Sequence, residues 1–159
     1  MSLNTVQLYT QQQLDGLTCA TLPAAQAWVL PPPTTQPADN PQIYVWGGRS
    51  DESRMTLPRF RAQKRIAHTI SLWIQWVSDS NPDNVQQFPV FLDTITYTLR
   101  SLPIPAQLTD PTTGAVSTLL NMGERIITEY GTPLALQPQG LLLHTAAMSL
   151  AVAEILNPA

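Results

Sequence analysis

Charged side chains are scarce in this sequence. They make up 12% of the 159 residues, about half of their share in an average globular domain. The formal net charge is −3, which argues against a general affinity for nucleic acid and leaves only a local basic segment to supply one. Because a surface with so few charges repels copies of itself weakly, this composition favours a protein that works inside an assembly.

Cysteine and long apolar runs are also nearly absent. Cys19 is the only cysteine, so no intrachain disulfide can form, and no basic residue lies near it in the sequence to activate its thiol. No apolar run approaches the roughly 18 residues of a membrane-spanning helix, and we expect no membrane contact. The first residues lack the basic and apolar regions of a signal peptide, so we expect synthesis in the cytoplasm.

The residue types that carry enzyme chemistry form no recognisable motif. His68 and His144 are the only histidines, and both fall on apolar faces of expected strands, so we interpret them as structural. The eleven acidic residues are scattered and form no ligand cluster with a histidine. Gly47-Gly48 lacks the third glycine and the following helix of a phosphate-binding loop. The sequence therefore predicts no catalytic residue, no cofactor and no metal site, and we do not expect an enzyme.

The chain length suits one domain, 1–159, with a sizeable core. Alternation of large apolar with smaller residues predicts long strands over 65–77 and 141–155, although the alanines of the second segment leave a helix as the alternative. A His-Thr pair stands early in both runs, and we expect the two strands to be neighbours in one sheet. Three shorter strands are predicted at 43–46, 116–120 and 125–130.

Two helices are predicted beside this sheet. The first covers residues 2–15. The second covers 82–102, because Asn81 is a capping residue and Pro82 suits the first helical position, while Pro89 offers a later start. The sequence thus predicts an α+β fold: an antiparallel or mixed β-sheet with an N-terminal helix and a central helix packed on one face.

Two long loops are predicted. The first, at 31–42, is rich in proline, and three consecutive prolines favour an extended, stiff conformation. The second, at 47–64, follows Gly47-Gly48, which we expect to end the preceding strand. It carries no clean periodicity and is predicted to be a basic extended arm.

Positive charge is concentrated on this arm and the residue after it. Six of the eight basic residues lie there: Arg49, Arg54, Arg59, Arg61, Lys64 and Arg65. We interpret the arm as a protein–protein contact, because arginine is enriched at interfaces; a plain solvated loop and a nucleic-acid contact are the alternatives. Asp51 and Glu52 lower its charge, and Phe60 is its only aromatic residue, so direct nucleic-acid contact is not expected.

Trp73 is a further candidate for an interface. It falls on the opposite side of the strand 65–77 from Ile70, Leu72 and Ile74, so it should cover a second layer or a partner subunit. The complete candidate interface consists of Arg49, Arg54, Arg59, Phe60, Arg61 and Trp73.

Three stretches carry a family resemblance. They are Arg65-Ile66-Ala67-His68-Thr69-Ile70-Ser71-Leu72-Trp73, then Phe91-Leu92-Asp93-Thr94-Ile95 with Leu99, and the long final strand with Glu154 near its end. In this order, together with the low charge, the chain resembles phage tail-terminator and head–tail connector (neck) proteins. The resemblance implies a structural virion protein, assembled in the host cytoplasm. It would form an oligomeric ring of identical subunits, a homohexamer, that caps the tail tube protein and joins it to the head connector proteins.

An alternative hypothesis is a small α+β binding module of a different class. It would use the basic arm 49–65 to contact nucleic acid, with an affinity that falls steeply with salt.

Overall fold

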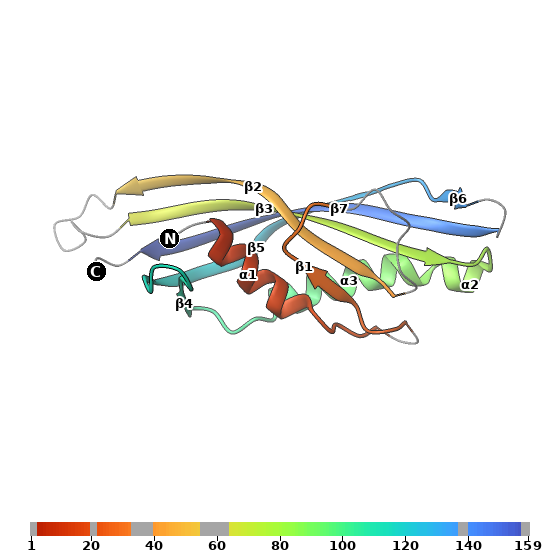
Figure 1. Ribbon diagram of the computed structural model, residues 1–159, viewed down its shortest axis with the longest axis horizontal. Helices are drawn as coiled ribbons and strands as arrows, with labels where there is room; N and C mark the ends of the chain where they lie inside the picture. The colour runs from red at the N-terminus through yellow and green to blue at the C-terminus, as the bar shows by residue number, and fades with distance from the viewer. Residues whose placement is uncertain (1–2, 20–21, 33–39, 55–63, 137–139, 157–159) are drawn as a thin grey trace.

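The computed structural model describes residues 3–19, 22–32, 40–54, 64–136 and 140–156. Within this part, the chain forms an elongated α+β structure in which a curled, mixed seven-stranded sheet carries helices on one face (Figure 1). The predicted α+β class, with an N-terminal helix and a central helix, is confirmed.

The described helices are α1 (Leu3–Leu14), α2 (Pro82–Val85) and α3 (Gln87–Arg100). The described strands are β1 (Gln26–Trp28), β2 (Gln42–Arg54), β3 (Lys64–Ser78), β4 (Ala106–Thr109), β5 (Val116–Tyr130), β6 (Leu134–Leu136) and β7 (Leu141–Leu156). The sheet order is β1-β2-β3-β7-β5-β4, and β6 pairs with β7 beside this path. β1 runs parallel to β2, whereas the other pairs are antiparallel.

The two strands with the strongest alternation form the centre of the sheet. β3 and β7 pair antiparallel over the full length of β3, from Lys64 opposite Leu156 to Ser78 opposite Leu142. Residues 141–155 are therefore a strand and not a helix, and the predicted neighbourhood of the two strands is confirmed. Because paired residues point to the same face, the large residues of both strands build one continuous apolar surface.

This apolar surface packs against both main helices. Ile70, Leu72 and Ile74 of β3 join residues from both helices in one buried cluster. α1 contributes Val6 and Leu14, while α3 contributes five residues at helical spacing: Phe88, Phe91, Leu92, Ile95 and Leu99. Figure 1 shows the helices on the same side of the sheet. The other face of the central strands is left without a described helix.

The predicted helix over 82–102 is divided into two helices. Asn81 caps α2 and accepts a hydrogen bond from the backbone of Asp83, with Pro82 at the first helical position as predicted. α2 ends at Val85, because the ring of Pro89 would clash with the Val85 carbonyl if the helix continued. In the first turn of α3 the same proline is tolerated.

The structure corrects the predicted loop 47–64 over residues 47–54. Gly47-Gly48 does not end the strand: β2 continues to Arg54, with a bulge between Val45 and Gly48. The positive φ angles of the two glycines, 81° and 136°, make this bulge possible. Pairing with β3 outweighs the weak strand propensity of the polar residues that follow.

Other boundaries also differ from the prediction. Residues 116–130 form one strand, β5, whose pairing is irregular between Met122 and Ile126, where Gly123 has a φ of 80°. β1, β4 and β6 were not predicted. Residues 33–39 of the proline-rich loop 31–42, and residues 55–63 with Arg59, Phe60 and Arg61, lie outside the described part.

We expect Gly48→Ala to destabilise the protein much more than Gly47→Ala. A Cβ on Gly48 would collide with the backbone carbonyl oxygen of Thr69, whereas a Cβ on Gly47 would meet nothing within 4 Å. The free energy of unfolding should fall by about 3 kcal/mol or more for Gly48→Ala and by about 1–2 kcal/mol for Gly47→Ala. Urea denaturation followed by tryptophan fluorescence measures both, and equal losses would contradict the bulge geometry.

Candidate functional site

Small side chains line the middle of the sheet face that is turned away from the helices, which we call the open face. They are half-buried and come from β3 and β7: Thr69, Ser71, Thr145, Ala147, Ser149 and Ala151. Trp73 stands among them, opposite in direction to the buried Leu72 and Ile74, so its predicted orientation is confirmed. A face of small residues allows the backbone of another element or molecule to approach closely.

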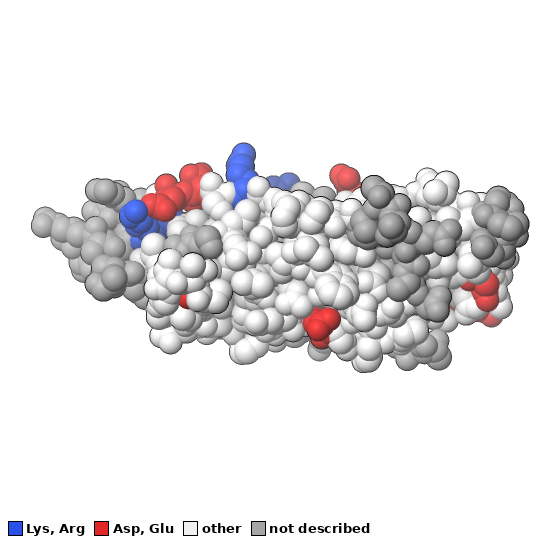
Figure 2. Space-filling view, in the orientation of Figure 1, with Lys and Arg blue, Asp and Glu red and all other residues white. Residues whose placement is uncertain are grey.

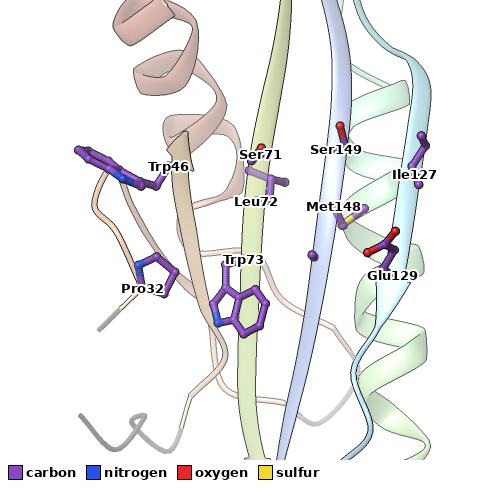
Figure 3. A pocket seen from close by; sticks show the side chains of 10 residues that line it. Pro32, Trp46, Ser71, Leu72, Trp73, Ile127, Glu129, Met148 and Ser149 are labelled. Atoms are coloured by element: carbon purple, nitrogen blue, oxygen red, sulfur yellow. The ribbon is translucent and has the colours of Figure 1, made fainter. Parts of the chain in front are cut away.

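A hollow of about 410 Å³ lies in the open face (Figure 3). It spans β2, β3, β7 and β5, with Ser71, Ala147 and Ser149 on its floor. The indoles of Trp46 and Trp73 lie on one side of the hollow. Ile127 and Glu129 of β5 lie on the other side. Trp46 and Ile127 are 50% and 44% exposed. Exposed apolar groups around a hollow are typical of an interaction surface.

The register of the strands sets Trp73 and Glu129 against each other. Ala147 pairs with Trp73 on one side and with Glu129 on the other, so the three residues form one row across the sheet. Two strand spacings separate the indole from the carboxylate, roughly 10 Å between backbones. Figure 3 shows the Glu129 oxygens directed toward the hollow. An indole facing a carboxylate across such a gap suits a cationic group.

Basic residues occupy the open face beyond the hollow. Arg49 pairs with Thr69, so it lies on the same face as Trp73, and Arg65 follows near the end of the strands. Figure 2 shows few charged side chains on the visible surface, with the visible Lys and Arg confined to one half of the molecule, some of them beside acidic residues. Lys64 forms an ion pair with Glu52 at 2.7 Å. Arg54 is the last residue of β2 and pairs with Lys64.

The structure thus brings two of the predicted interface residues, Arg49 and Trp73, onto one face. The contribution of Glu129 and Trp46 to the hollow was not predicted, because it depends on four strands lying side by side. The carboxylate of Glu129 and the position of Trp46 just before Gly47-Gly48 were the only signals in the sequence.

An array of four polar side chains crosses the other face of the sheet, and three of them, His68, Ser117 and Glu154, are buried. Ser50 Oγ lies 2.6 Å from His68 Nδ1, and His68 Nε2 lies 2.7 Å from Glu154 Oε1. Ser117 Oγ donates to Glu154 Oε2 at 2.8 Å. The side chains of His68 and Glu154 are 0% exposed. A neutral His68 that donates from Nε2 to Glu154 and accepts from Ser50 at Nδ1 satisfies every member of the array.

The pairing of His68 with Glu154 could not be predicted from the sequence. Glu154 and His68 are 86 residues apart and meet only because β3 and β7 pair. The array lies on the helix-covered face, so the hollow is on the opposite side of the sheet.

His144 is held in a different way. Its Nε2 lies 2.7 Å from Ser78 Oγ, and since that hydroxyl donates its hydrogen to the Asp79 carbonyl, His144 is the donor. Trp76 and Phe88 pack against its ring, and burial lowers the pKa of His144 below 6.5. Both histidines are therefore buried and hydrogen-bonded, as predicted for structural histidines.

The described part contains no group of three or more His, Cys, Asp or Glu residues placed to hold a metal ion. None of the helices in the described ranges has both the length and the apolar character needed to cross a membrane. No model of a known protein family matches the sequence, and no curated protein matches it.

We expect Glu154→Leu to lower the free energy of unfolding by about 3 kcal/mol, because it leaves the His68 and Ser117 donors buried without an acceptor. Glu154→Gln is the matched control, since its amide oxygen can still accept from His68, and its loss should be clearly smaller. Urea denaturation compares the two variants. A Glu154→Leu protein as stable as the wild type would contradict the role of the array.

We expect stability to decline as the pH falls from about 7 to 5. The pKa of His144 is lower in the folded than in the unfolded chain, so unfolding takes up a proton once the pH falls below about 6.5. His144→Gln keeps a donor for Ser78 but does not titrate, and it should weaken this pH dependence. The pKa values of Asp79 and Asp110 are also lowered, but from 3.8, so these two residues affect stability only at lower pH. Identical urea midpoint profiles for both proteins would exclude His144 as the cause.

Proposed function

We propose that this protein is a structural virion component, a tail terminator or neck protein, that packs against identical subunits in a ring. The ring would cap the tail tube and join it to the head connector. The observation that carries the proposal is the open face, with its small floor residues and its exposed Trp46 and Ile127 around a hollow. The resemblance to phage tail-terminator and neck proteins supports the particular role.

The open face suits packing against another protein surface. Its half-buried Ser, Thr and Ala residues let a neighbouring backbone come close, and the exposed indole of Trp46 supplies apolar area for a contact. The same face carries an acidic hollow and a basic end, so each subunit presents two different surfaces. Contacts between two different surfaces close into rings when the rotation between subunits permits it.

The alternative of a nucleic-acid-binding module finds less support. Lys64 is paired with Glu52, and Asp51 lies on β2 between Arg49 and Arg54, so fewer cations are free for phosphate groups. Arg49, Asp51 and Arg54 lie on β2, which pairs with β3.

The test blocks the open face and measures native mass by light scattering. The wild type should form a discrete oligomer, a hexamer, whereas Ala147→Arg should be monomeric, because it fills the floor of the hollow. Tyr97→Arg is the matched control: it makes the same charge change at a 73% exposed position of α3 and should leave the mass unchanged.

A monomeric wild type, or an Ala147→Arg variant that assembles normally, would refute the proposal. Titrating the same preparations with labelled DNA at two salt concentrations tests the alternative hypothesis of a nucleic-acid-binding module. Affinity that falls steeply with salt would favour the binding module.

A further inference from the structure

We propose that the hollow of the open face receives a basic side chain from a second copy of this chain, and that Arg65 is the residue that enters it. This inference rests on the proposed function and deepens it, because it names the two surfaces that would join neighbouring subunits.

The hollow has the chemistry of a guanidinium receptor. The indole of Trp73 and the carboxylate of Glu129 lie in one row with only Ala147 between them. A guanidinium in this gap can stack on the indole and form two hydrogen bonds to the carboxylate at the same time. Ser71 and Ser149 pair in the adjacent row, and their hydroxyl oxygens can accept further hydrogen bonds from the guanidinium.

Arg65 is the described basic residue that best fits this receptor. It is exposed, it alternates with the buried Ile66, and it therefore projects on the open face. It has no ion pair with another described residue, whereas Lys64 is paired with Glu52.

The geometry favours a contact between copies over one within the chain. Arg65 and Trp73 are eight residues apart on one extended strand, roughly 27 Å, which exceeds the reach of an arginine side chain. Arg65 therefore cannot enter the hollow of its own subunit. Arg49 pairs with Thr69, only two residues along β3 from Ser71, so it lies close to the hollow of its own subunit without lining it.

The charge distribution makes a second copy the fitting occupant. Six of the eight basic residues lie between positions 49 and 65, while the hollow holds a carboxylate that has no ion pair among the described residues. One chain thus supplies both halves of a complementary contact. The low overall charge also keeps the long-range repulsion between copies weak.

The experiment exchanges the two charges and measures native mass against concentration by light scattering. Arg65→Glu and Glu129→Arg should each weaken self-association by about tenfold or more, because each sets like charges against one another in the contact. The double variant should recover the wild-type mass. Arg100→Glu, which makes the same charge change at the exposed end of α3, should assemble like the wild type.

Mixing the two single variants in equal amounts gives the decisive result. Each subunit then finds its complement only in a subunit of the other kind, so the mixture should form an alternating ring of wild-type mass. Recovery in the double variant but not in the mixture would overturn the inference, because it would place the contact within one chain.

Two other outcomes separate this inference from the proposed function. If the wild type forms an oligomer that neither single variant weakens, the Arg65 contact is refuted and the proposed assembly stands. If the wild type is monomeric at every concentration, both are refuted. Loss of DNA binding by Arg65→Glu without a change in mass would instead assign Arg65 to nucleic acid.

Discussion

The antiparallel ladder between β3 and β7 is the constraint on which the rest of the structure depends. Both strands alternate large and small residues, and in the middle of the ladder their register sets Ile70 and Leu72 against Leu150 and Met148 on one face, and Thr69 and Ser71 against Ala151 and Ser149 on the other. Burial of the large face under α1 and α3 supplies the hydrophobic driving force. The small face is the direct consequence of the same alternation, so the core and the open face are two results of one pattern. A slip of one residue would exchange them.

The array of Ser50, His68, Glu154 and Ser117 specifies this register a second time. His68 and Glu154 come from the two strands of the ladder, and Ser50 and Ser117 come from the strands on either side. A shifted ladder would leave a carboxylate in the core without its partners, which is far more costly than a poorly packed apolar residue. The array thus adds specificity to a ladder whose apolar residues alone, Ile, Leu and Val, could tolerate some repacking.

The features that could be predicted from the sequence depend on residues that are close to one another along the chain. Strict alternation predicted β3 and β7, and Asn81 before Pro82 predicted the start of α2. The strand 47–54 was missed because its polar residues have weak strand propensity and adopt the conformation through pairing with β3.

The site was predictable only in part, for the same reason. The orientation of Trp73 follows from alternation within one strand. Its position opposite Glu129 depends on the order β3-β7-β5, which the sequence does not reveal. The meeting of His68 with Glu154 likewise required knowledge of a pairing between segments 86 residues apart.

The order of the strands in the sheet differs from their order along the chain. β7 lies between β3 and β5, yet a ribosome makes it after both of them. Until β7 emerges, the edges of β3 and β5 that pair with it have no partner. The residues that β7 contributes to the large apolar face are also missing. The sheet can therefore close only after β7 has been made, and a chain that ends before β7 lacks the middle of the open face.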